Sequence, residues 1–171
     1  GGVADLRWPP EPAPSSSTGG AAQTTTPPYD AEERPFRLAA LLGVTKPGPP
    51  LLISGQAPGF VRAVQGHVPD AGVVGIGTTP PDDADQAGSV GMGWVVHAER
   101  LPFRDRSISG VALTGGATLS TLVEALRCLR RGARLVIDPA PEGIAELVTS
   151  AGGELLLQQG SVAVAFNPLA G

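Results

Sequence analysis

Short, wholly apolar runs recur along the chain from residue 51 onward, separated by turns rich in glycine, proline and polar residues. These runs lack the strict alternation of apolar and polar residues that marks a strand with one solvent-exposed face. They therefore predict strands that are buried on both faces of a parallel sheet. The expected strands are 51–54, 71–77, 94–98, 109–116 and 133–140.

The clearest helical pattern lies between two of these runs, at residues 120–132. Ser120 is the expected N-cap, Glu124 follows in the next turn, and Gly132 is expected to end the helix. One face is apolar over its whole length, which is typical of a helix that packs on a sheet. That face consists of Leu122, Ala125, Leu126 and Leu129.

Shorter helices and a hairpin complete the pattern. Helices are expected at 35–44, with Pro35 in the first turn, at 59–68 and at 142–153. Two apolar segments flank the Gln-Gln-Gly turn at 158–160, which predicts an antiparallel hairpin. Strands that alternate with helices predict an α/β domain over 35–171, with a doubly wound, mostly parallel sheet and a C-terminal antiparallel hairpin.

Residues 1–34 show neither the helical nor the strand periodicity of apolar residues, and they are rich in Pro, Ser, Thr, Gly and Ala. Such a segment cannot bury a face of its own, so we expect an extended arm. One interpretation is a disordered tail, and the other is an arm that lies on a partner protein. Leu6, Trp8 and Tyr29 are the candidate partner-binding residues, because large apolar and aromatic side chains contribute much of the energy of interfaces.

The composition excludes several classes of protein. The 171 residues include 12 Lys and Arg against 16 Asp and Glu, a net charge of −4, so no nucleic-acid partner is expected. Cys128 is the single cysteine, and His67 and His97 are isolated, so neither a disulfide nor a metal site is predicted. No apolar run reaches the roughly 18 residues of a membrane span. The sequence also opens without a secretory signal core, so a soluble, cytoplasmic protein is expected.

Two long stretches resemble class I S-adenosylmethionine-dependent methyltransferases. "AERLPFRDRSISGVAL", at 98–113, is similar to the family's A-x-x-L-P-F-x-D-x-S-F-D segment. "LVEALRCLRRGARLVI", at 122–137, is similar to its E-A-x-R-V-L-K-P-G-G-x-L-x-I segment. The likeness extends over about 35–166 and implies the family's Rossmann-like fold, with S-adenosylmethionine as the cofactor of an active member.

The first motif of that family departs from its pattern here. The resemblance implies an acid at the end of the first strand and then Gly-x-Gly-x-Gly, so that the backbone can approach the cofactor closely. Ile53 occupies the position of the acid, and Gly55, Ala57 and Gly59 occupy those of the glycines. Pro58 also removes a backbone donor from the turn.

The other cofactor positions depart as well. Gly77 occupies the position of the acid that would hold the ribose hydroxyls, and His97 occupies the position of the acid near the adenine. The last Asp of S-F-D falls on Ser109, and the later Pro and Gly become Arg131 and Ala133. Gly55, Ala57, Gly59, Gly77 and His97 are therefore expected to be a vestigial site with no cofactor and no catalytic residue.

Other residues allow both a structural and a functional interpretation. Gly55 and Gly59 form a tight turn or line a small pocket, and His97 is a polar strand end or a base. Asp138 ends a strand, where it caps a loop or contacts a ligand. Cys128 is a buried thiol rather than a nucleophile. An acidic loop is either solvated or binds a cation; it contains Asp82, Asp83 and Asp85. A basic cluster either stabilises the helix dipole or contacts a protein or membrane surface; it contains Arg127, Arg130, Arg131 and Arg134.

The missing acids favour a non-catalytic accessory subunit of a larger assembly, which binds its protein partners through the arm. Its place is cytoplasmic or peripheral to a membrane complex. One instance is an extrinsic subunit of a bacterial photosynthetic reaction centre, although no residue favours that complex over another assembly. The alternative is a divergent S-adenosylmethionine-dependent methyltransferase that acts on a small molecule or protein. A third hypothesis is a regulatory module that binds another small ligand in the vacated cleft.

Overall fold

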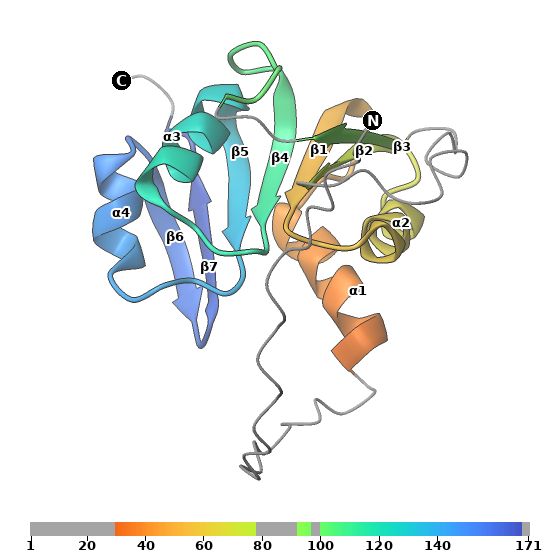
Figure 1. Ribbon diagram of the computed structural model, residues 1–171, viewed down its shortest axis with the longest axis horizontal. Coiled ribbons are helices and arrows are strands. Elements are labelled where there is room, and N and C mark those ends of the chain that lie inside the picture. Colours follow the sequence, from red (N-terminus) through yellow and green to blue (C-terminus); the bar gives the residue numbers. More distant parts are fainter. Residues whose placement is uncertain (1–29, 78–91, 97–99, 169–171) are drawn as a thin grey trace, which may run out of the picture.

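A computed structural model describes residues 30–77, 92–96 and 100–168 of the chain, and their strands form one seven-stranded sheet (Figure 1). The strand order is β3-β2-β1-β4-β5-β7-β6. Only β7 runs antiparallel to its neighbours β5 and β6, and every other pair is parallel. The strands are β1 Gly48–Ser54, β2 Ala71–Gly77, β3 Met92–Val96, β4 Ile108–Leu113, β5 Leu129–Ile137, β6 Glu154–Gln159 and β7 Val162–Phe166.

This topology confirms the predicted doubly wound sheet with its C-terminal hairpin. The chain builds outward from β1 through β2 to β3, and then returns to place β4 on the other side of β1. The direction of winding therefore reverses between β1 and β4. In open parallel sheets the loops diverge at such a point, and ligands commonly bind outside the carboxyl ends of its strands.

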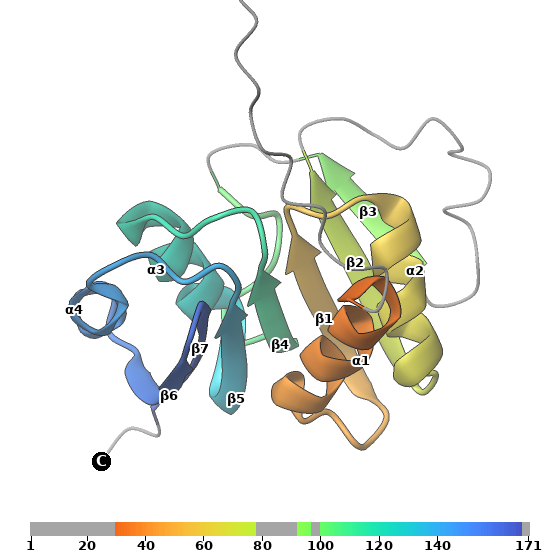
Figure 2. The ribbon, with the colours of Figure 1, turned by 90° about the horizontal axis from the view of Figure 1, so that it is seen from below.

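Helices cover both faces of the sheet (Figure 2). The helices α1 Asp30–Leu42 and α2 Pro58–His67 lie on one face, and α3 Leu119–Cys128 and α4 Ile144–Ser150 lie on the other. β1 shows why both layers are needed. Leu51 and Ile53 join the core beneath α1 and α2, Leu52 joins the core beneath α3 and α4, and all three have 0% exposed surface.

The start of α1 differs from the prediction. The helix begins at Asp30 rather than Pro35, so that Pro35 lies inside it. Pro35 has no backbone amide to donate within the helix and its ring crowds the carbonyl four residues earlier, which weakens these turns. Arg34 holds the early turns in place, because its Nε donates to Asp138 Oδ2 at 3.2 Å, from a position 104 residues away in sequence.

The ends of α3 also differ from the prediction. Thr118, and not Ser120, is the N-cap, in a reciprocal capping pair with Thr121. The helix ends at Cys128, four residues before Gly132. Asn167 explains the early end, because its side-chain amide donates to the carbonyls of Leu126 at 3.0 Å and Leu129 at 2.7 Å. The last carbonyls of the helix are satisfied from outside it, and Leu129 begins β5 instead.

The two stretches that carry the family resemblance are joined by one side chain, Arg127. Its Nε and Nη2 donate to both carboxylate oxygens of Glu124 at 3.0 and 2.9 Å. Its Nη1 donates to Asp105 at 2.7 Å and to the Phe103 carbonyl at 2.9 Å, and Nη2 also reaches the Leu101 carbonyl at 3.1 Å. The guanidinium thus fastens the loop before β4 to α3.

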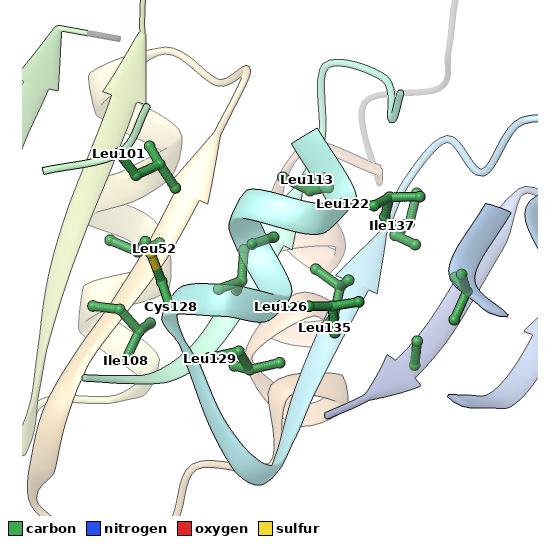
Figure 3. Packing of buried hydrophobic residues seen from close by; sticks show 14 of the residues in the cluster. Leu52, Leu101, Ile108, Leu113, Leu122, Leu126, Cys128, Leu129, Leu135 and Ile137 are labelled. Atoms are coloured by element: carbon green, nitrogen blue, oxygen red, sulfur yellow. The ribbon is translucent and has the colours of Figure 1, made fainter. Parts of the chain in front are cut away.

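This Arg127 network encloses the core beneath α3. Leu101 is buried there with Leu52 and Ile108 (Figure 3). Figure 3 shows the Cys128 sulfur next to Leu52, and Cys128 has no exposed surface. Burial raises the pKa of its thiol, so Cys128 is an inert core residue, as predicted.

The Arg127 network predicts how stability changes with pH. The hydrogen bonds from Arg127 lower the pKa of Glu124 below its usual value of 4.5. The stability that this carboxylate contributes is therefore present above about pH 4.5 and is lost as the pH falls through its lowered folded value. Glu124→Gln keeps the shape and an oxygen for the Leu101 amide. We expect it to reduce the free energy of unfolding by about 1 to 2 kcal/mol at pH 7.

Urea unfolding of wild type and Glu124→Gln from pH 7 to pH 3 measures this effect. The difference in the free energy of unfolding between the two proteins should become smaller below pH 4.5. Glu142→Gln, at an exposed position outside the network, is the control and should change stability by less than about 0.5 kcal/mol at any pH. A gap for Glu124→Gln that stays constant over the whole range would contradict the assignment.

Candidate functional site

The carboxyl ends of β1, β2 and β4 meet where the winding of the sheet reverses, and this edge is the candidate site. β1 ends at Ser54, and Gly55 turns the chain with a φ of +78°. Ala57 is extended at the N-cap of α2 without a side-chain cap, and Pro58 is the first helical residue. The opening amide of α2, which would face an anionic ligand, is thus replaced by a proline nitrogen that has no proton.

The turn after β1 touches the turn after β4, backbone against backbone. A Cβ added to Gly55 would lie 2.4 Å from the Gly115 nitrogen and 2.5 Å from its Cα. A Cβ on Gly115 would in turn lie 3.0 Å from the Gly55 Cα. Real Cβ atoms do not approach other atoms as closely as 2.4 Å, so Gly55 requires glycine, whereas a Cβ at Gly115 would need the Gly55 backbone to shift by a few tenths of an ångström. The glycines here bring two protein backbones together, and this use does not depend on a ligand.

Hydrogen bonds between the strand ends hold this contact. The Thr114 amide donates to the Ser54 carbonyl at 3.1 Å, and the Thr114 hydroxyl donates to the same oxygen. The Gly55 amide donates to the Ile76 carbonyl at 3.3 Å. Thr114 is buried, so its polar atoms are committed to the protein. The backbone groups at the switch point therefore bond to each other.

The described residues that directly follow β1 and β4 include no carboxylate, and the residues after Gly77 of β2 lie outside the described part. Asp138 directly follows β5 on this edge, and its side chain is only 14% exposed. Arg34 donates to it at 3.2 Å and Arg37 lies 3.8 Å from the same oxygen. The Arg34 guanidinium also lies over the Phe60 ring, 5.7 Å from its centre. Asp138 therefore fastens α1 to the sheet through these ion pairs, a role that differs from the expected loop cap.

Comparison with known proteins identifies the architecture. No protein-family model matches the sequence, and the curated proteins give no match. Solved structures do match. The methyltransferase in the complex with the Trm112 methyltransferase activator of Haloferax volcanii aligns with a TM-score of 0.65 at 14% identity, over 84% of this chain and 92% of that one. The N-methyltransferase NodS of Bradyrhizobium japonicum aligns with a TM-score of 0.63 at 12% identity, over 84% and 99%.

The chain has a class I methyltransferase-like fold. At these identities the likeness establishes the fold and not the reaction. The [4+2]-cyclase SpnF illustrates the difference, since it aligns with a TM-score of 0.58 at 19% identity, over 74% of this chain and 58% of its own. The family resemblance in the sequence is confirmed at the level of this fold.

Three of the positions expected to be vestigial, Gly55, Ala57 and Gly77, lie at a turn or at the end of an element of the methyltransferase-like fold. Gly55 makes the close contact, Ala57 caps α2, and Gly77 ends β2. Gly59 lies in the first turn of α2, with open space where a Cβ would be. Ser109, at the last Asp position of S-F-D, donates to the Pro49 carbonyl at 2.5 Å. This bond helps to explain why β1 starts at Gly48, three residues earlier than predicted.

Several predicted residues lie outside the described part of the chain. They are Leu6, Trp8, Tyr29, Asp82, Asp83, Asp85 and His97. Within the described part, no group of His, Cys, Asp or Glu side chains is arranged to hold a metal ion. Over the same residues, no helix has the length and apolar character needed to cross a membrane.

Sequence reasoning missed the partner of the first turn. Gly115 and Thr114 complete the contact at the switch point, yet neither was singled out. The available signal was the glycine pair of "TGG" directly after an apolar strand, because glycine next to a strand end often marks a close backbone approach.

The Gly55–Gly115 contact predicts opposite effects for two matched substitutions in one turn. Gly55→Ala places a Cβ against the Gly115 backbone at a positive φ, and should reduce the free energy of unfolding by about 2 to 4 kcal/mol. Gly59→Ala adds the same methyl group in open space inside a helix, and should raise stability by up to about 1 kcal/mol. Thermal and urea unfolding of both variants measure the difference. Equal effects of the two substitutions would show that the contact is absent.

Proposed function

We propose that this protein is a non-catalytic accessory subunit of a larger protein assembly, with a methyltransferase-like domain that does not use S-adenosylmethionine. One observation carries the proposal. The retained family residues Leu101, Glu124 and Arg127 all belong to a network that fastens the fold together, as described above. Among the described positions that the resemblance assigns to the cofactor, Ile53 and Gly55 instead serve the packing of the fold.

The chemistry of the cofactor explains why these departures matter. Its ribose hydroxyls and adenine amine require hydrogen-bond acceptors, and carboxylates serve best. Each such bond to a charged group contributes about 1.5 to 3 kcal/mol. Losing two or three of them weakens binding by several powers of ten. The described residues at the ends of β1 and β2 do not fit the cofactor, since Ile53 is fully buried and Gly77 has no side chain.

The surface supports association with other proteins. Large apolar side chains are exposed on three elements, with Phe36 on α1 60% exposed. Leu119 and Val123, one turn apart on α3, are each 45% exposed, and Leu156 and Leu157 are exposed on the edge strand β6. The Haloferax methyltransferase with this fold forms a complex with the Trm112 activator. A protein partnership of this fold therefore has a precedent.

The competing function is a divergent S-adenosylmethionine-dependent methyltransferase acting on a small molecule or protein. Asp82 and Asp83 come after the Thr-Thr-Pro-Pro segment that follows β2 in the sequence, and Glu99 comes after β3. These acids are the observation that favours this alternative, because a ribose ligand near the end of β2 needs a carboxylate. Direct measurement of cofactor binding separates the two functions.

Isothermal titration calorimetry of the full chain with S-adenosylmethionine and S-adenosylhomocysteine tests the proposal. We expect no binding heat up to about 1 mM ligand, because the missing acceptors cost several powers of ten in affinity. An active methyltransferase titrated in parallel serves as the control for ligand quality. A dissociation constant in the micromolar range would overturn the proposal and favour the methyltransferase.

Deletion of the arm tests the mode of association. The deletion must end at residue 29, because α1 begins at Asp30 and Arg34 binds Asp138. The shortened protein should keep the unfolding temperature of the full chain within a few degrees, and should no longer co-purify with its native partners. A control deletion through Leu42 removes α1 and should destabilise the domain, since it uncovers Leu51 and Ile53. Unchanged co-purification of the chain without residues 1–29 would exclude the arm as the partner-binding segment.

A further inference from the structure

The positive charges of this acidic protein are unevenly placed. Four exposed arginines lie on two neighbouring loops at the amino ends of β4 and β5, the end of the sheet opposite to the candidate site. Figure 1 shows the loop before β4 and the start of β5 side by side at this end. We name the set the basic edge; it consists of Arg104, Arg106, Arg130 and Arg131.

The hydrogen-bond register brings the two loops together. Ile108 of β4 pairs with Leu129 of β5, and the Arg106 amide donates to the Arg127 carbonyl at 2.9 Å. After Leu129 the register shifts, so that Gly110 pairs next with Arg134. Residues 130–133 therefore form a bulge at the start of β5, with Gly132 at a φ of +73°. The two loops present their arginines from adjacent strands.

These charges are not neutralised by the described residues. Among those residues, no ion pair joins an acid to the side chain of Arg104, Arg106, Arg130 or Arg131. The acid between the first two, Asp105, binds Arg127 at 2.7 Å. Glu124 binds the same arginine, and the acids at the amino ends of the other described strands, Asp70 before β2 and Glu154 in β6, lie two strands away, which is about 10 Å.

The backbone of Arg106 gives a second, independent observation. Arg106 is the only non-glycine residue with a positive φ in the described part of the chain, at 56°. This left-handed conformation is unfavourable for a residue with a Cβ, and glycine or asparagine adopts it more readily. No hydrogen bond or ion pair of the Arg106 side chain within the described structure offsets that strain. The Arg106 backbone bonds to Arg127, but its side chain has no partner in the described structure, and a strained position with a side chain directed to no internal contact suits an external one.

We propose that the basic edge binds an acidic segment of a partner protein. Guanidinium groups pair with carboxylates through two parallel hydrogen bonds, which makes clustered arginines suited to Glu- and Asp-rich chains. A membrane is less well matched, since the exposed large apolar side chains of the described residues lie on α1, α3 and β6 and not on these loops. A nucleic acid is also less well matched to two short loops on a chain of net charge −4.

This binding surface goes beyond the proposed accessory function and does not depend on the loss of cofactor binding. α1 begins near Asp138 at the carboxyl end of the sheet and ends near Arg134 at the amino end. The N-terminal arm therefore joins the domain at the end opposite to the basic edge. Contacts at both ends allow one molecule to connect two acceptor surfaces.

Fluorescence anisotropy of a labelled dodecapeptide of eight Glu and four Gly, titrated with the full chain, tests the proposal. We expect saturable binding at about 50 mM NaCl that weakens at about 300 mM, because salt screens exposed charges. Arg130→Gln with Arg131→Gln should raise the dissociation constant about tenfold, the combined effect of two lost charge pairs. The matched double variant Arg37→Gln with Arg62→Gln removes the same charge elsewhere, and should stay within about twofold of wild type.

Arg106→Gly separates binding from folding. It removes one charge from the basic edge and also relieves the positive φ, so it should weaken peptide binding about threefold while the unfolding temperature stays equal or rises. Equal peptide affinity in the wild type and the Arg130/Arg131 variant would overturn the proposal, as would an absence of saturable binding. Tighter binding to phosphatidylserine-containing vesicles, or to a single-stranded 20-mer oligonucleotide, would also overturn it and assign the basic edge to that class of partner.

Discussion

The rest of the structure depends on the complete burial of the central strands on both faces. The consecutive residues Leu51, Leu52 and Ile53 have no exposed surface, although successive side chains of a strand point to opposite sides. A strand of this kind is stable only between two layers of helices, and α1 with α2 and α3 with α4 supply them. The right-handed crossovers of a parallel sheet then send the loops after β1 and β4 apart at one edge. The place of the candidate site thus follows from where apolar residues occur.

The same constraint explains which family residues remain. The Arg127 guanidinium uses its donors on two acids and two carbonyls, and so closes the core over Leu101. This arrangement serves the fold whether or not a ligand is bound. The acids that the resemblance implies at Ile53 and Gly77 are absent from this sequence, yet the sheet is complete. A sequence can lose them without losing its architecture, so a long match to a family's packing residues is evidence of shape and weak evidence of activity.

The strands could be predicted from sequence because two-sided burial leaves a local mark, an unbroken apolar run. The boundaries that were missed are set by distant residues. α3 ends at Cys128 because Asn167, from after the last strand, bonds its final carbonyls. α1 begins at Asp30, where the contact of Arg34 with Asp138 spans 104 positions. At the candidate site, Gly55 was recognised from its motif, but its contact with Gly115 depends on the pairing of β1 with β4, which no local pattern contains.

The docking of α1 also has a consequence for the order of folding during synthesis. α1 precedes every strand of the sheet in the chain, and it packs on the nearby α2 as well as on the later strands β4 and β5. Its ion pair with Asp138 forms only after β5 has been synthesised. The apolar face of α1, with Leu38 and Leu42, is therefore only partly covered during synthesis until β5 is in place, which leaves a segment open to chaperones and to premature association.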